Sequence, residues 1–145
     1  MTKHITIIHG PNLNTLGSRE PEIYGTETLA DIDKKCMEKA RSLGLSAECY
    51  QSNHEGELVG KIQEAGKNSV GLIINAGAYT HTSIAMMDAL LTLRIPVIEV
   101  HLSNIFRREE FRHQSYISKA AKGVICGFGS DSYMLALEGV AKLVK

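Results

Sequence analysis

The stretch Val70-Gly71-Leu72-Ile73-Ile74-Asn75-Ala76 (VGLIINA) decides the fold predicted for this chain. Its apolar side chains occupy successive positions, so a strand formed here would present apolar groups to both faces of a sheet. Gly77 follows directly and is a natural end for the strand. Strands that are apolar on both faces are typical of parallel sheets covered by helices on both sides. We therefore expect a central strand of an α/β sheet.

On both sides of this stretch, short apolar runs alternate with longer runs that have helical spacing. We expect further strands over Ile5–Ile8, Ala47–Tyr50, Val97–Leu102 and Val124–Cys126, and helices over Thr28–Leu43, Glu57–Ala65, Ser83–Leu93 and Asp131–Val144, with a short helix after Phe111. Strands that alternate with helices predict a parallel sheet. The size favours a flavodoxin-like three-layer α/β sandwich with five parallel strands in the order 2-1-3-4-5.

Length and composition narrow the class of protein. The chain has 145 residues, which predicts a single catalytic domain over residues 1–145. Sixteen basic and sixteen acidic side chains give no net charge, so we expect neither nucleic acid nor a membrane as a partner. The three cysteines form no C-x-x-C pair, and no basic and apolar leader opens the sequence. We expect a cytoplasmic protein with reduced thiols.

Polar side chains gather where the predicted strands end. His9 directly follows the first predicted strand, and Asn75 and His101 lie near the carboxyl ends of the third and fourth. The carboxyl ends of parallel strands meet at one edge of a sheet, where ligands of such folds bind. Histidine is not a usual turn residue, so its presence at the ends of the first and fourth strands favours a functional site over an ordinary polar rim.

The fourth strand carries the most informative polar residues. Side chains alternate along a strand, so Val97, Glu99 and His101 should share one face, which helices should cover. A buried Glu99 requires a cation, and we expect that cation among the arginines of the following segment RREEFRH, Arg107–His113. The same segment predicts a local positive pocket for a carboxylate, because arginine binds carboxylates with two parallel donors. A solvated charged helix face is the ordinary alternative.

The connection from Asn12 to Gly25 is long and polar, as lids and binding loops are. It places Arg19 near Tyr24. Arginines in a closed site would lower the pKa of a tyrosine and make it a usable base near neutral pH. The helix predicted over Ser83–Leu93 is apolar nearly all round, which favours a subunit contact that would also contain Asp88.

These segments together closely resemble the type II 3-dehydroquinate dehydratases. The resemblance is carried by GPNLNTLGSREPEIYG (Gly10–Gly25), QSNHEGEL (Gln51–Leu58), INAGAYTHTSIA (Ile74–Ala85), VIEVHLSNIFRREEFRHQSYIS (Val97–Ser118) and GFGSDSYMLAL (Gly127–Leu137). The resemblance implies a hydro-lyase that removes water from 3-dehydroquinate by anti elimination through an enolate, giving 3-dehydroshikimate. It further implies the shikimate pathway, with quinate catabolism by the same reaction as the alternative, and neither a metal nor an organic cofactor.

The resemblance also implies roles for individual residues. Tyr24 would take the proton alpha to the ketone and His101 would protonate the departing hydroxyl. Arg19, assisted by Arg108, would favour the tyrosinate. Asn12 would hold the water or donor that stabilises the enolate oxygen, and Glu99 would orient His101. The residues implied in substrate binding are Asn75, His81, Asp88, Leu102, Ser103 and Arg112. Asp88 would reach the site of a neighbouring subunit in a homododecamer built from trimers.

Three other kinds of function share parts of this pattern. A metal-dependent hydrolase could use His9, His81 and His101, since histidines are common zinc ligands. An imine mechanism needs a lysine in the site, and the predicted strand ends carry none. A signalling receiver or a flavin-binding module shares the predicted fold, but a receiver needs acidic residues where Pro11 and Asn12 stand.

Overall fold

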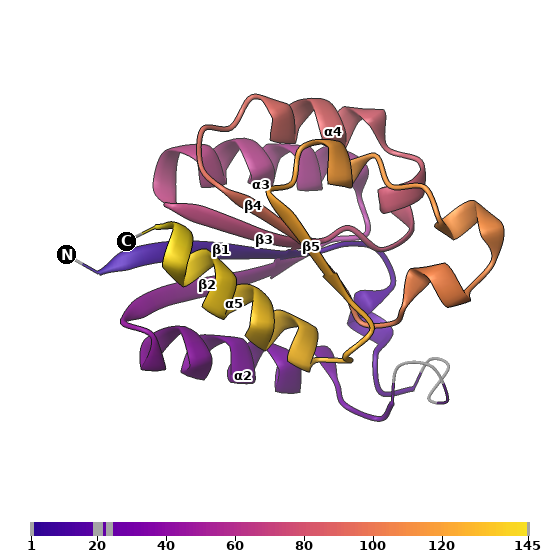
Figure 1. The fold of residues 1–145 in the computed structure, drawn as a ribbon, viewed down its shortest axis with the longest axis horizontal. Helices are drawn as coiled ribbons and strands as arrows, with labels where there is room; N and C mark the ends of the chain where they lie inside the picture. Colours follow the sequence, from indigo (N-terminus) through magenta and orange to yellow (C-terminus); the bar gives the residue numbers. More distant parts are fainter. Residues whose placement is uncertain (1, 19–21, 23–24, 145) are drawn as a thin grey trace.

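A computed structural model describes residues 2–18, 22 and 25–144, and its centre is a five-stranded sheet (Figure 1). The strands are β1 (Lys3–His9), β2 (Leu45–Gln51), β3 (Gly71–Asn75), β4 (Val97–His101) and β5 (Gly123–Cys126). They lie in the order β2-β1-β3-β4-β5, and every neighbouring pair is parallel. The predicted fold class and strand order are therefore confirmed.

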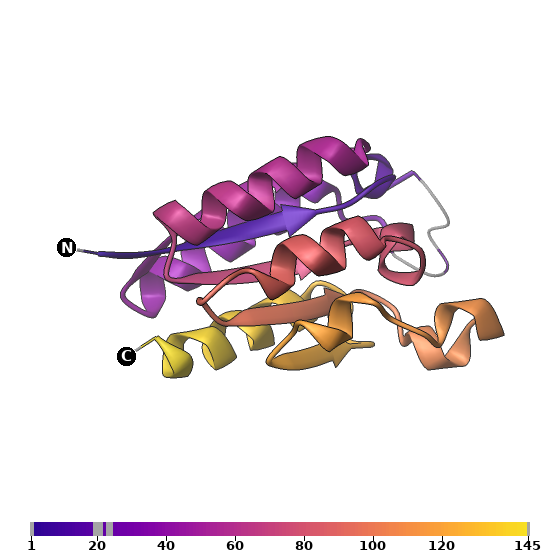
Figure 2. The same ribbon diagram turned by 90° about the horizontal axis from the view of Figure 1, so that it is seen from above.

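Helices cover both faces of the sheet, so the molecule has three layers (Figures 1 and 2). Helices α2 (Leu29–Ser42) and α5 (Asp131–Leu143) cover one face, and α3 (Glu55–Asn68) and α4 (Ile84–Leu91) cover the other. The start of α2 is set by a capping box, in which Thr28 and Asp31 each accept a backbone N–H of the other. No helix in the described part of the chain is both long and apolar enough to span a membrane.

The strands alternate between two separate apolar cores. Ile73 and Ile98 pack with α2 and α5, whereas Leu72, Ile74 and Val97 pack with α3 and α4. This is the alternation predicted for a strand with both faces covered. It confirms that Val97 and Ile98 face opposite layers, and it places each strand-end residue in a defined layer.

Short 3-10 helices lie in the connections that follow β1, β3 and β4. They are η1 (Leu13–Thr15), η2 (Gly77–His81), η3 (Ile105–Arg107), η4 (Glu110–Arg112) and η5 (Ile117–Lys119). The sequence predicted one short helix after Phe111, and the structure has three such turns between β4 and β5 instead. Turns of three residues have no hydrophobic period, which is why the pattern could not resolve them.

Candidate active site

A cavity of about 180 Å³ opens at the rim beyond β1, β3 and β4. Its lining contains most of the residues singled out from the sequence: Asn12, Asn75, His81, His101, Leu102, Ser103, Arg108 and Arg112. It also contains Pro11, Leu13, Gly77, Ala78 and Ile105, which give it apolar and backbone surface. The structure therefore brings together, in one hollow, side chains that lie up to a hundred positions apart in sequence.

The loops after β1 and β3 meet closely enough to close one side of the cavity. The N–H of Gly10 donates to the carbonyl of Asn75 at 2.7 Å, and a Cβ built at Gly10 would lie 2.3 Å from the Ala76 oxygen. Only glycine leaves room for this backbone contact. Two residues on, Asn12 takes a left-handed conformation with φ of 70°, which asparagine adopts more readily than most side chains. This turn places Asn12 at the cavity wall.

His101 and Glu99 form a buried pair at the end of β4. Nε2 of His101 lies 2.5 Å from Oε2 of Glu99, and the Glu99 side chain is fully buried. A carboxylate accepts, so Nε2 carries the hydrogen of this bond. Nδ1 is then the ring nitrogen left for exchange with a molecule in the cavity.

The partners of Glu99 correct the prediction from sequence. We expected an arginine of the segment Arg107–His113, but the described structure pairs Glu99 with His101 and with the hydroxyls of Ser115 and Ser118. Burial acts to raise the pKa of Glu99, but the hydrogen bond and charge of His101, with the two serines, outweigh it. The pKa of Glu99 is therefore lowered, and the group stays a carboxylate beside His101.

His81 stands beside His101 as a neutral imidazole. The two rings are nearly parallel, with centroids 6.5 Å apart. Burial is the largest cause that lowers the pKa of His81, and the nearby His101 and Arg112 act in the same direction. Nδ1 of His81 donates to the carbonyl of Gln114 at 2.8 Å, because a carbonyl can only accept. Nε2 of the neutral ring is therefore an acceptor.

Two of the three arginines of the segment Arg107–His113 line the cavity. Nε of Arg112 donates to Glu109 at 2.9 Å, and Nε of Arg108 lies 3.8 Å from the same carboxylate oxygen. Glu109 therefore bridges the two side chains from the exposed side. Arg107 is exposed and lines an adjoining hollow beside Gly127, which shares Arg108 with the cavity. Arg108 and Arg112 therefore lie at the cavity, as the sequence predicted for this segment, and a role in binding a carboxylate stays a prediction.

One predicted site residue, Asp88, lies away from the cavity, and two others are not described. Tyr24 and Arg19 fall outside the described residues. Asp88 is exposed on α4, away from the cavity, and the large apolar side chains of Ile84 and Leu91 are exposed on the same helix. The sequence predicted that a second surface covers this helix, and Asp88 lies where such a surface would meet it.

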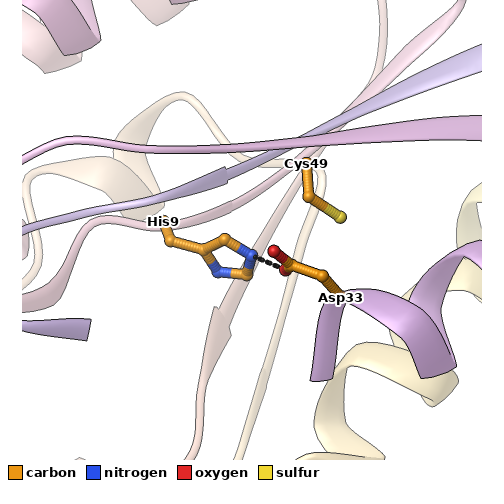
Figure 3. A group of neighbouring side chains, drawn as sticks. All are labelled: His9, Asp33 and Cys49. Atoms are coloured by element: carbon orange, nitrogen blue, oxygen red, sulfur yellow. Dashed lines mark hydrogen bonds and ion pairs between the residues drawn. The ribbon is translucent and has the colours of Figure 1, made fainter. Parts of the chain in front are cut away.

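The histidine trio considered for a metal is not assembled. His9 is fully buried on the α2/α5 side of the sheet, where its Nε2 lies 2.7 Å from Asp33 (Figure 3). Its Nδ1 lies 2.9 Å from the hydroxyl of Tyr133. Asp33 and Cys49 are the described residues that gather with it, all three ligand atoms lying within 4.8 Å of one another. His81 and His101 lie at the cavity instead.

Sequence reasoning missed residues that do not line the cavity but form hydrogen bonds with Glu99 and Asn75. Ser115 and Ser118 lie in a segment without clear periodicity, so nothing marked them as partners of Glu99. Tyr133 was assigned to the apolar face of the last helix, and its hydroxyl in fact accepts a hydrogen bond from Asn75 at 3.1 Å. The tyrosine hydroxyl was the one signal available, since a buried phenol needs a polar partner.

The cavity combines a proton donor or acceptor, fixed cations and amide groups. A histidine held by a buried carboxylate can give or take a proton. Arg108 and Arg112 can bind an anionic group, and Asn12 and Asn75 can bind oxygens on which charge develops. The arrangement suits acid–base chemistry on a small oxygen-rich anion.

Comparison with known proteins identifies relatives over almost the whole chain. The family model described as "Dehydroquinase class II" matches residues 3–141. The 3-dehydroquinate dehydratase of Dinoroseobacter shibae is 58% identical over 94% of this chain and 91% of its own length. That of Rhizobium meliloti is 56% identical over 100% and 98%, respectively. The type II dehydroquinase of Propionibacterium acnes superimposes with a TM-score of 0.94 at 45% identity, covering 98% of each chain.

Proposed function

Because the chain belongs to the class II dehydroquinase family, we propose how its site residues share the reaction of that family. The chain is a 3-dehydroquinate dehydratase, a hydro-lyase of the shikimate pathway. Quinate breakdown is not favoured. The observation that carries the proposed roles is the buried pair of Glu99 and His101 at the wall of a cavity lined by two arginines.

His101 is the general acid of this proposal. The lost hydroxyl is a poor leaving group unless it is protonated, and Nδ1 of His101 supplies that proton while Nε2–H stays bonded to Glu99. The Glu99 carboxylate holds the ring of His101 in one orientation, with Nδ1 toward the cavity. A positioned acid of this kind contributes about 10²–10⁴-fold to the rate.

Tyr24 is the proposed base, and it acts on the face of the substrate opposite to His101, as an anti elimination requires. This role rests on the match to the family motif. Arg19 and Arg108 would keep the phenol partly ionised, because nearby cations favour the charged form of a tyrosine. The ketone makes the adjacent C–H acidic enough for a phenolate to remove the proton.

The remaining residues bind the substrate and the enolate formed from it. Asn12, fixed by its left-handed turn, holds the donor or water that stabilises the enolate oxygen. Arg112 contacts the carboxylate or a hydroxyl of the substrate. The other proposed contacts come from Asn75, His81, Leu102 and Ser103. The reaction removes one proton from carbon, breaks one C–O bond with protonation of the departing hydroxyl and forms one C=C bond, without net oxidation or reduction, so the proposal assigns no step to a cofactor or a metal.

We also propose an assembly and a compartment. The exposed Ile84 and Leu91 of α4 support a subunit interface there, with Asp88 reaching a neighbouring site in trimers that form a dodecamer. The three cysteines are free thiols, which supports a reducing compartment such as the cytoplasm.

Mixing purified protein with 3-dehydroquinate and following the ultraviolet absorbance of the conjugated enone tests the function directly. We expect product with the wild type and a loss of about 10²–10⁴-fold in kcat for His101→Ala. Borohydride added with substrate should leave the enzyme active. Irreversible inactivation by borohydride would indicate an imine, and near-normal turnover of His101→Ala would exclude this histidine as the acid.

A further inference from the structure

A continuous chain of hydrogen-bonded polar side chains runs from the partly exposed Asp33 of helix α2, along the face of the sheet covered by α2 and α5, to the cavity. Asp33 bonds to Nε2 of His9 at 2.7 Å, Nδ1 of His9 bonds to the Tyr133 hydroxyl at 2.9 Å, and Tyr133 bonds to Nδ2 of Asn75 at 3.1 Å. His9 and Asn75 are register partners on β1 and β3, so both face the layer that contains Tyr133. Asn75 is the member that lines the cavity.

The amide of Asn75 has only one orientation in this chain. The backbone N–H of Gly77 lies 3.1 Å from Oδ1 of Asn75, and an N–H can only donate. Nδ2 must therefore face Tyr133, whose oxygen accepts from it. Burial raises the pKa of Tyr133 well above its ordinary value, so the hydroxyl stays a neutral phenol. Asn75 keeps its second amide hydrogen for a molecule in the cavity.

His9 supports the Tyr133 oxygen in either of its protonation states. A neutral His9 with its hydrogen on Nε2 accepts a hydrogen bond from the Tyr133 hydroxyl at Nδ1. A charged His9 instead donates a hydrogen bond from Nδ1 to the same oxygen. Burial acts to lower the pKa of His9, but the hydrogen bond and charge of Asp33, aided by Cys49, raise it overall. In both states Tyr133 remains an acceptor for Asn75.

Space filling alone does not account for this chain. His9 and Tyr133 are fully buried, and Asn75 is 3% exposed. Buried polar groups cost stability unless they are hydrogen-bonded, and apolar residues of similar volume often do as well or better. A network in which every polar group is hydrogen-bonded holds its side chains in one fixed geometry.

We propose that Asp33, His9 and Tyr133 are positioning residues that hold the Asn75 amide with its donor toward the substrate. This inference rests on the proposed function, in which Asn75 contacts 3-dehydroquinate. The Asn75 amide then offers a fixed N–H to a substrate oxygen and cannot rotate to offer its carbonyl there.

The same cluster does not favour a metal ion. The Cys49 thiol lies beside His9 and Asp33, and Figure 3 shows the three side chains converging. Contact with Cys36, followed by burial, raises the pKa of the Cys49 thiol, which keeps it protonated. A thiol binds metal as the thiolate. His9 and Asp33 are already bonded to each other.

A double-mutant cycle tests the proposal. Tyr133→Phe removes one oxygen, and we expect it to raise KM for 3-dehydroquinate about 5- to 10-fold with a smaller change in kcat. In an Asn75→Ala background the same substitution should change kcat/KM less than about twofold, because its target is gone. Tyr50→Phe is the matched control, since it removes a phenol oxygen from a partly buried tyrosine outside the cavity.

A purely structural role would give a different result. Tyr133→Phe would then lower kcat/KM by the same factor in both backgrounds, and that outcome overturns the proposal. Should Tyr133→Phe fail to fold, Asp33→Asn at the partly exposed end of the chain decides the question, with a smaller loss that also vanishes beside Asn75→Ala.

Two further outcomes separate the remaining explanations. Wild-type protein that does not turn over 3-dehydroquinate rejects the proposed function, whereas an active wild type with independent effects rejects only the positioning role. Dialysis against EDTA and addition of Zn²⁺ complete the experiment. Activity that requires added Zn²⁺ would assign His9, Asp33 and Cys49 to a metal centre and overturn the proposal.

Discussion

Glu99 and His101 are two residues apart on β4, and Oε2 of Glu99 lies 2.5 Å from Nε2 of His101 on the same face of the sheet. Residues i and i+2 of a strand point to the same side, so the strand itself sets this pairing. The carboxylate is fully buried, and the imidazole is buried except where it reaches the cavity. Stability and chemistry therefore both depend on one short segment of backbone.

Glu99→Gln should change how stability depends on pH. The pKa of Glu99 lies below its ordinary value of 4.5 in the folded protein, so its contribution is full above that value and is lost as pH falls through the folded pKa. Between about pH 5 and pH 3, we expect the melting temperature of the wild type to fall further than that of Glu99→Gln. Glu138→Gln, at an exposed ion pair with Lys39, is the control and should follow the wild type. Parallel curves for wild type and Glu99→Gln would contradict the assignment.

Tyr24→Phe should cost orders of magnitude in kcat and leave KM within a few fold, because the phenol acts as base and contributes little to ground-state binding. Steady-state kinetics with 3-dehydroquinate measure both constants. Tyr116→Phe is a suitable control, since Tyr116 is a half-buried tyrosine outside the cavity. Near-normal turnover of Tyr24→Phe would reject this residue as the base.

Gly10→Ala should destabilise the protein by about 1–3 kcal/mol and lower activity, because the new methyl group would overlap the backbone of Ala76. Chemical denaturation gives the free energy of unfolding. Gly60→Ala is the matched control: a Cβ there meets nothing within 4 Å, and alanine favours the helix by up to about 1 kcal/mol. Equal stabilities of the two variants would mean that the β1 and β3 loops can move apart freely.

Mixing two inactive variants tests whether Asp88 acts across an interface. Asp88→Asn and His101→Ala should each reduce activity strongly in separate assays. Hybrid oligomers would contain some sites with the wild-type Asp88 of one subunit and the wild-type His101 of another, so denaturing and refolding the mixture should restore part of the activity. No recovery, or an active monomer in gel filtration, would remove Asp88 from the site.

The sequence predicted the sheet because the apolar runs alternate with helical runs of clear period, and the strand order followed from size. The site was predictable where a polar residue interrupted a readable alternation, as Glu99 does. His9 shows where this reasoning stops. Before it, apolar and polar residues do not alternate along Ile5–Ile8, so the sequence did not indicate which face of the sheet His9 would take. The structure places it on the face covered by α2 and α5.

The partner of Glu99 was mispredicted for a similar reason. Arg108 and Arg112 are close to Glu99 in sequence, but the turns η3 and η4 carry them to the cavity wall. The chain then returns over β4 and brings Ser115 and Ser118 to the carboxylate. The path of an irregular connection depends on tertiary packing, which a local pattern does not record.

Residues from both helix-covered faces of the sheet meet at the cavity, and this has a consequence for how the enzyme responds to its ligand. His101 reaches the cavity from the face covered by α3 and α4, and Asn75 is anchored to α5 on the opposite face. A molecule that contacts both side chains links the two faces of the sheet at its edge. Occupancy must then protect the amides of both helical layers together, and a fragment that forms only one layer has no working site.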